Sequence, residues 1–317
     1  METAPYYDDI ARAAEGGAAH WLTTSDGLRI RVGHWKPENA KGTVLIFPGR
    51  TEFVEKYGQT ARALHDQGYA SIAIDWRGQG IADRMTPNRA VGHVGQFADY
   101  QKDVEAVMAF VKAIDLPRPY FLIGHSMGGC IGLRSLLEGL DVNAAMFSAP
   151  MWGIQMSTAL RPVAWGLSAV STSLGFDQSL APGQFEQSYV LRAPFMGNTL
   201  TTDAEMYDVM RDQLKAHPDL ALGGPSLRWL NTSLREMHGL STRPAPAVPC
   251  TTFLGRDEGI VDPVRIRDRM GAWPDGTLRV ISGGRHEMLM DTPQIRNPII
   301  SETVALFDAN RKISNAA

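Results

Sequence analysis

The stretch that decides the fold is Tyr120-Phe121-Leu122-Ile123-Gly124-His125-Ser126-Met127-Gly128-Gly129. The apolar run at 120–123 predicts a buried β-strand, and the residues from 127 onward predict an α-helix. Gly124-x-Ser126-x-Gly128 between them predicts a sharp strand-to-helix turn, which small residues must flank. Such a turn lifts the serine hydroxyl out of the sheet edge and aims the first amides of the helix at it. The stretch therefore predicts that Ser126 is a nucleophile.

Strands and helices alternate on both sides of this turn. Apolar runs predict strands at 43–47, 70–74, 120–123, 142–147, 250–254 and 278–281. Helical spacing of apolar residues predicts helices at 53–64, at 97–114 and after Ser126, and we expect Asn297-Pro298 to open a last helix. The segment 20–35 predicts a hairpin that turns at Asp26-Gly27. This alternation is typical of an α/β fold with a mainly parallel sheet flanked by helices.

The alternation stops after Pro150. From residue 151 to 246 the patterns predict helices and no clear strand. An apolar stripe runs through 160–174, a capping box begins at Thr202, and Ser226 is expected to cap a further helix that ends before Gly239. We interpret residues 151–246 as a helical cap inserted into a core formed by residues 1–150 and 247–317. The alternative is that these helices are a layer of the main core.

A serine hydroxyl is a weak nucleophile at neutral pH and needs a general base. With a turn of this type the partners follow in the chain order serine, acid, histidine. His286 follows the predicted strand 278–281 in a loop whose glycines allow the imidazole to reach Ser126. The loop after the strand 250–254 offers three carboxylates for the acid. We prefer Glu258, then Asp257 and last Asp262, because Asp262-Pro263 is typical of a helix N-cap.

Hydrolysis at a serine also needs two amide donors for the developing oxyanion. We expect one from the N–H of Met127, which follows the nucleophile, and the other from the N–H of Arg50, after the strand 43–47. The side chains of Arg50 and Glu52 can equally well be surface charges. The turn 75–80, Asp-Trp-Arg-Gly-Gln-Gly, has too few glycines for a dinucleotide loop and is interpreted as a structural turn near the site.

Composition excludes several other classes of protein. The chain has 317 residues, a formal net charge of -3 and two cysteines, Cys130 and Cys250. This charge offers no electrostatic basis for nucleic-acid binding, and no metal motif, cofactor loop or disulfide framework is visible. Residues 1–9 are acidic and polar and no run approaches ~18 apolar residues, so we expect neither a signal peptide nor a membrane span. We expect a cytoplasmic protein of undetermined oligomeric state, and peripheral contact with the inner face of the membrane stays open because it needs only an apolar patch.

Together these motifs resemble the α/β-hydrolases grouped as monoacylglycerol lipases and bacterial lysophospholipases, especially the lysophospholipase L2 type. The resemblance covers roughly residues 21–307, and it rests on segments 48–52, 75–80, 124–129, 255–262 and 286–287. It implies an α/β-hydrolase fold with a helical cap over the site. Two departures matter: Pro48 stands where the family usually has histidine, and the acid is commonly aspartate, whereas family placement puts Glu258 there.

The leading hypothesis is that the chain cleaves a carboxylic ester of a single-acyl lipid, a lysophospholipid or a monoacylglycerol. In this hypothesis Ser126 forms the acyl-enzyme, His286 moves the proton and Glu258 orients His286. A second hypothesis is a serine aminopeptidase of the same superfamily, which would need a carboxylate such as Glu186, Asp203 or Glu205 to hold a free N-terminus. A third is a non-catalytic protein that binds a small ligand in the same hollow.

Overall fold

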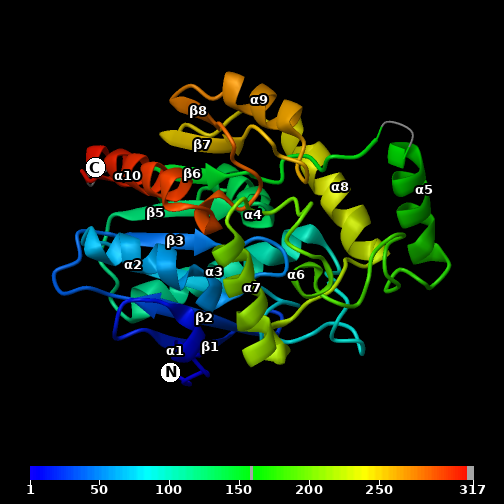
Figure 1. Cartoon of the computed structure of the whole chain (residues 1–317), viewed down its shortest axis with the longest axis horizontal. Coiled ribbons are helices and arrows are strands. Elements are labelled where there is room, and N and C mark those ends of the chain that lie inside the picture. Colours follow the sequence, from blue (N-terminus) through cyan, green and yellow to red (C-terminus); the bar gives the residue numbers. More distant parts are fainter. Residues whose placement is uncertain (158–159, 313–317) are drawn as a thin grey trace.

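A central sheet organises the protein, whose computed structural model describes residues 1–157 and 160–312 (Figure 1). Its strands are β1 Ala18–Thr23, β2 Arg29–Trp35, β3 Thr43–Phe47, β4 Ala70–Asp75, β5 Tyr120–His125, β6 Ala145–Ser148, β7 Cys250–Gly255 and β8 Gly276–Ile281. Their spatial order is β1-β2-β4-β3-β5-β6-β7-β8. Only the β1–β2 and β2–β4 pairs are antiparallel. The predicted hairpin and the mainly parallel sheet are thereby confirmed.

Helices follow the sheet strands and cover them. They are α1 Asp8–Ala11, α2 Gly58–Asp66, α3 Tyr100–Ala113, α4 Met127–Leu137, α9 Pro263–Gly271 and α10 Pro293–Ala309, with 3-10 turns η1 Val54–Tyr57, η2 Phe97–Asp99 and η4 Met288–Met290. Every residue of β3, β4, β5, β6 and β7 is buried. Strands that are buried along their whole length need helices on both faces, which accounts for their continuous apolar sequences.

The last helix differs from its prediction. It begins at Pro293, and Pro298 lies inside it. Pro293 suits the first position because its missing N–H would have no partner within the helix. Pro298 removes one internal hydrogen bond, but Ile299, Ile300, Val304 and Phe307 still bury one face of the helix. Packing therefore decided where the helix begins, and the expected start at Asn297-Pro298 is wrong.

The segment between β6 and β7 is helical. It contains α5 Leu160–Ser173, α6 Tyr189–Arg192, α7 Ala204–Ala216, η3 Pro218–Leu220 and α8 Leu227–Ser241. α8 packs against α4, and α5 packs against α8 on the side away from the sheet (Figure 1). A second apolar cluster joins α6, α7 and η3 to Phe53 and Met290. The division into a core and a cap at residues 151–246 remains a prediction.

Two local expectations in this segment need correction. α7 is capped by Asp203, whose carboxylate accepts from the amides of Glu205 and Met206, and Thr202 instead donates to Asp291. α8 continues past Gly239 to Ser241 because Leu240 packs into the main core and keeps the last turn helical. Ser226 caps α8 as expected.

Part of the predicted apolar stripe is exposed. Val163 and Val170 of α5, and Leu174 directly after it, are 58%, 51% and 66% exposed. The buried face of the helix carries Ser168 and Ser171 instead, and Asn231 of α8 donates to the Ser168 hydroxyl at 3.2 Å. A helix that buries serines and exposes aliphatic side chains is unusual for a water-soluble surface.

Two further features concern the cysteines and the apolar character of the helices. Cys130 and Cys250 are both free thiols, and both are buried. Across the described residues, no helix combines the length and the apolar character needed to cross a bilayer.

Candidate active site

Ser126 occupies a strained turn between β5 and α4. Its φ and ψ are 48° and -116°, values that non-glycine residues rarely adopt. Gly128 makes this possible, because a Cβ there would lie 1.9 Å from the carbonyl oxygen of Phe47 on β3. The turn is therefore packed directly onto the neighbouring strand. The side chain of Ser126 is 9% exposed, so its hydroxyl is reached through a cavity and not across an open surface.

The structure brings three predicted residues into one hydrogen-bonded chain. The Oγ of Ser126 lies 2.9 Å from Nε2 of His286, and Nδ1 of His286 lies 2.9 Å from Oε2 of Glu258. The Oε1 atom of Glu258 accepts from the amides of Ile260 and Val261 at 2.6 and 3.1 Å. This geometry can pass the serine proton to the imidazole and hold the imidazole in one orientation.

The other two carboxylates of the acid loop lie elsewhere. Asp257 is exposed and does not reach His286. Asp262 caps α9 through the amide of Val264 and pairs with Arg161 at 3.0 Å. Of the three acids weighed from the sequence, the structure thus brings only Glu258 to the histidine.

The environment of Glu258 favours its ionised form. Burial would raise its pKa, but the neighbouring His286 and the hydrogen bonds from that ring and from the Ile260 and Val261 amides lower it below the usual value. A carboxylate that stays ionised can stabilise the imidazolium formed when His286 accepts a proton.

The two residues expected to supply the oxyanion amides lie near Ser126. Met127 is the first residue of α4, and Arg50 lies in the loop after β3 and lines the same cavities as Ser126. The turn at 75–80 braces this loop: Gln79 donates to the carbonyl of Gly49 at 3.1 Å and accepts from the amide of Thr51 at 2.9 Å. The function of that turn is structural, as the sequence suggested.

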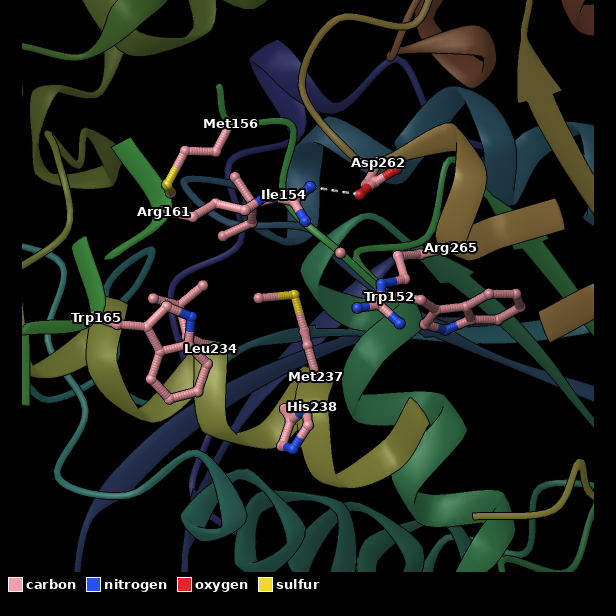
Figure 2. Close-up of a pocket in the computed structure, with 11 residues that line it drawn as sticks. Trp152, Ile154, Met156, Arg161, Trp165, Leu234, Met237, His238, Asp262 and Arg265 are labelled. Atoms are coloured by element: carbon pink, nitrogen blue, oxygen red, sulfur yellow. Dashed lines mark hydrogen bonds and ion pairs between the residues drawn. The ribbon is translucent and has the colours of Figure 1, made fainter. Parts of the chain in front are cut away.

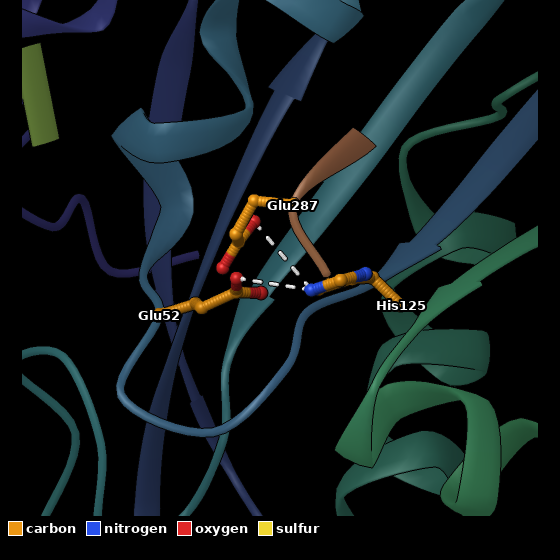
Figure 3. Close-up of side chains that lie close together, drawn as sticks. All are labelled: Glu52, His125 and Glu287. Atoms are coloured by element: carbon orange, nitrogen blue, oxygen red, sulfur yellow. Dashed lines mark ion pairs between the residues drawn. The ribbon is translucent and has the colours of Figure 1, made fainter. Parts of the chain in front are cut away.

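A buried ionic cluster lies next to Arg50, at the loop that follows β3. Glu52, His125 and Glu287 converge there (Figure 3). Nζ of Lys56 donates to Glu52 at 2.6 Å and to Glu287 at 2.8 Å. Glu52 also accepts from the amide of Gly49 and, at 2.6 Å, from the hydroxyl of Tyr57. Because Glu287 follows His286 directly, the cluster connects the loop after β3, which carries Glu52, to the loop that carries His286.

Charge pairing sets the protonation of this cluster. Burial would raise the pKa of Glu287, but Lys56 and His125 hold it well below the usual value. Burial would lower the pKa of Lys56, and the two carboxylates raise it instead. Glu52, His125 and Glu287 also have ligand atoms within 4.8 Å of one another, as a metal would require. Lys56 already supplies a cation between the two carboxylates, so these residues fit an ion pair better than a metal centre.

Two cavities meet at Ser126. One, of about 420 Å³, is lined mostly by apolar side chains, including Leu167, Leu227, Trp229 and Leu230 from α5 and α8. The other, of about 320 Å³, is lined partly by the ionic cluster and His286 and partly by residues of α6 and α7. Both volumes lie in the range of small-molecule sites.

A third hollow lies away from the chemistry. It is bounded by α5, α8 and α9, contains the Arg161–Asp262 ion pair, and has a volume of about 140 Å³ (Figure 2). Neither Ser126 nor His286 lines it. The two larger cavities are therefore the better candidates for substrate.

Sequence reasoning missed the cluster of Lys56, His125 and Glu287 and left the Glu52 side chain undecided. Glu52 is in fact 2% exposed. Two features of the sequence could have indicated this cluster. Glu52 and Lys56 are four residues apart just after the strand 43–47, and Glu287 follows His286 directly. Only the fold places these two segments against each other.

Comparison with known proteins places the chain in a family. Residues 38–293 match the family Hydrolase_4, described as serine aminopeptidase, S33. Lysophospholipase L2 of Escherichia coli K12 is 27% identical over 309 residues, which cover 92% of this chain and 88% of that protein. The probable lysophospholipase L2 of Haemophilus influenzae is 25% identical over 307 residues, 93% of this chain and 95% of that protein.

Solved structures agree on the fold. A soluble variant of monoglyceride lipase from Saccharomyces cerevisiae superposes with a TM-score of 0.72 at 21% identity, covering 92% of this chain and 95% of that one. A carboxyl esterase from Bacillus coagulans has the same TM-score at 15% identity, covering 94% and 100%. The family match spans well over half of the chain, and the chain therefore belongs to the Hydrolase_4 family and is a hydrolase of the α/β-hydrolase fold.

Proposed function

We propose that the protein hydrolyses the carboxylic ester of a single-acyl lipid, a lysophospholipid or a monoacylglycerol, through an acyl-enzyme on Ser126. The observation that carries the proposal is the Ser126–His286–Glu258 hydrogen-bonded chain at the base of an apolar cavity of about 420 Å³. Two relatives that align along most of their length are named lysophospholipase L2 and probable lysophospholipase L2, and this supports the same substrate class.

In the proposed reaction His286 accepts the proton of the Ser126 hydroxyl while Oγ attacks the ester carbonyl carbon. The amides of Met127 and Arg50 donate to the oxyanion of the tetrahedral intermediate. His286 then protonates the leaving glycerol oxygen, and the C–O bond breaks to leave an acyl-enzyme. Water repeats the sequence, with His286 as base, and releases the fatty acid. Glu258 stays ionised and stabilises the imidazolium in both halves.

We further propose that residues 151–246 form the cap that covers the acyl chain. Val163, Leu167, Leu227 and Leu230 from this segment line the cavity at Ser126. The exposed Val163 and Val170 on α5, and Leu174 directly after it, support peripheral contact with a lipid surface, from which such a substrate would enter. The buried free thiols are consistent with a cytoplasmic protein at the inner face of the membrane.

An amide substrate is less well supported, although the family description names an aminopeptidase. A peptide N-terminus needs an unpaired carboxylate near the serine. Glu186 accepts from Asn88, Asp203 caps α7 and Glu205 is 79% exposed, and none of them lines either cavity at Ser126. Glu52 and Glu287 do line one cavity, but Lys56 already pairs with both.

The test is a hydrolysis panel. Palmitoyl lysophosphatidylcholine, palmitoylglycerol, p-nitrophenyl esters and aminoacyl anilides are compared, with Ser126→Ala as the control. Turnover of the lipid esters that is lost in Ser126→Ala is expected. Labelling of Ser126 by a fluorophosphonate without turnover of any ester would contradict the lipid proposal, and preferential turnover of anilides would favour the aminopeptidase. Absence of labelling would favour a non-catalytic binding protein.

A further inference from the structure

The side chain of Arg50 lies where the two cavities meet. Four residues line both of them: Arg50, Ser126, Gln184 and Ile260. Arg50 is the one cation of this set, and its guanidinium carbon lies 5.6 Å from the centroid of the Trp229 ring. A ligand that fills both cavities across Ser126 therefore passes beside Arg50.

Arg50 also lacks the carboxylate partners of Arg31 and Arg77, the two arginines that are least exposed among the described residues. Arg31 pairs with Glu55 and Asp75, and Arg77 pairs with Asp26 and Asp103. Among the described residues, the side chain of Arg50 makes a single hydrogen bond, from Nη1 to the carbonyl oxygen of Gly223 at 2.9 Å, and no carboxylate lies within ion-pair distance of it. Its remaining N–H donors are left for a ligand.

The missing partner has an electrostatic cost. Burial lowers the pKa of Arg50 to about 10, whereas the carboxylates raise the pKa of Arg31 and of Arg77. An anion that binds in the cavity would restore the charge balance that the protein itself does not supply. A phosphate group suits the planar guanidinium because two of its oxygens can accept parallel N–H bonds.

We propose that Arg50 binds the phosphodiester of a lysophospholipid head group while the acyl chain of the same molecule lies in the apolar cavity. The inference rests on the proposed function and narrows it. Of the two single-acyl substrate classes, the lysophospholipid, which carries a phosphodiester, is preferred over the neutral monoacylglycerol. Arg50 then has two separate tasks: in the proposed reaction its backbone amide donates to the oxyanion, and its side chain selects the head group.

A structural role competes with this one. The hydrogen bond to Gly223 connects the loop after β3 to the segment before α8, and a Cβ on Gly92 would lie 2.9 Å from Nη1 of Arg50. An arginine that only holds the two segments together would affect every substrate to the same degree. A head-group residue affects the phosphodiester more, and this difference decides between the roles.

The first experiment measures kcat/KM of Arg50→Met for palmitoyl lysophosphatidylcholine and for palmitoylglycerol. Loss of a charge-assisted contact is expected to lower the value for the lysophospholipid about tenfold to a hundredfold more than the value for the neutral ester. Arg50→Lys should recover part of the difference, because it restores the charge without the planar fork. Arg161→Met is the matched control, because it removes an arginine that pairs with Asp262 at the third hollow. It should leave the ratio of kcat/KM for the lysophospholipid to kcat/KM for the neutral ester unchanged. Equal losses on both substrates in Arg50→Met would overturn the proposal.

The second experiment measures binding without turnover, so that a failed hydrolysis assay does not decide the question. Ser126→Ala and Ser126→Ala with Arg50→Met are titrated with dodecylphosphocholine and with dodecyl glucoside, both below their micellar concentrations. The second substitution should weaken binding of the phosphodiester by at least tenfold and of the glucoside much less. Such a result in a protein that cleaves no lipid ester would retain the Arg50 site and reject the proposed activity.

The fatty-acid product of the proposed reaction is another anion that Arg50 could bind in place of the phosphodiester. If palmitate inhibits the wild-type enzyme but not Arg50→Met, while both proteins bind dodecylphosphocholine equally, Arg50 holds a fatty-acid carboxylate and the head-group assignment is wrong.

Discussion

The sheet side and the helical side of the Ser126 site are built from opposite kinds of side chain. On the sheet side, Glu52, Lys56, Glu258, His286 and Glu287 are all buried and are paired with one another or with backbone amides. The helical side presents apolar groups from α5 and α8, and part of α5 is exposed. Proton transfer needs groups held at fixed distances, whereas an acyl chain needs only shape and apolar surface. Substitutions on the two sides should therefore fail in different ways.

The largest effect is expected from the nucleophile itself. Ser126→Ala should lower kcat for every ester by about a million-fold, because the acyl-enzyme can no longer form. The thermal unfolding temperature should stay close to that of the wild type, since a β-carbon is retained in the turn. Steady-state kinetics and differential scanning calorimetry measure the two quantities. Residual turnover near the wild-type rate would place the chemistry at another residue.

The next largest effect on kcat is expected from Glu258, the acid that accepts from His286. Glu258→Gln should lower kcat about ten-thousand-fold, because a neutral amide can hold the wrong tautomer of His286 and does not stabilise its cation. Asp257→Asn is the matched control on the neighbouring, exposed residue, and it should remain within about twofold of the wild type. If the two variants exchange these outcomes, Asp257 is the working acid and the hydrogen bond from His286 to Glu258 is not the one used in catalysis.

The ionic cluster should affect stability. Lys56→Met leaves Glu52 and Glu287 buried without a cation, and the free energy of unfolding at pH 7 should fall by about 3–5 kcal/mol. Lys102→Met breaks ion pairs with Asp26 and Asp99 at the surface and should lower the free energy of unfolding far less, because solvent screens these pairs. Urea unfolding compares them. Equal stability of the two variants would mean that one carboxyl of the cluster is protonated.

The contribution of this cluster to the free energy of unfolding should decrease at acidic pH. Glu287 has a folded-state pKa well below its unfolded value of about 4.3, so its contribution to stability is complete above that pH and is lost as the pH falls below it. The free energy of unfolding should therefore fall more steeply for the wild type than for Glu287→Gln between about pH 5 and pH 3. Urea unfolding across this range measures both slopes, and parallel slopes would contradict the lowered pKa.

The smallest effect belongs to the helical side. Leu167→Trp places a larger side chain in the apolar cavity, reduces its free volume and should lower kcat/KM for palmitoyl esters about tenfold relative to butyryl esters. Val170→Trp, one turn further along α5 and outside the lining, is the control and should leave this ratio unchanged. A chain-length profile with p-nitrophenyl esters reads out both variants. No change in Leu167→Trp would place the acyl chain outside this cavity.

Local sequence was sufficient for the elements with strong local signals. The strand, turn and helix around Ser126 were predictable because a buried strand reads as an apolar run and a tight turn needs glycine. The start of α10 at Pro293 was not predictable in the same way, because Thr292-Pro293 and Asn297-Pro298 offer similar local starts and only the packing of the helix selects one. The exposed part of the α5 stripe likewise depends on α8, which buries the opposite face.

By itself, the sequence determined the α/β-hydrolase fold, the turn at Ser126 and the chain order of the candidate site residues, since each depends on periodicity or on steric limits within a few residues. Tertiary structure alone decided that Glu258 and not Asp257 reaches His286, and that Lys56 joins Glu52 to Glu287, which lies 231 residues after Lys56 in the chain. It also decided that Arg50 lines both cavities at Ser126 without a carboxylate partner among the described residues. These outcomes depend on distances between segments remote in the chain. Such distances are set by how the whole sheet and its helices pack, and no local pattern records them.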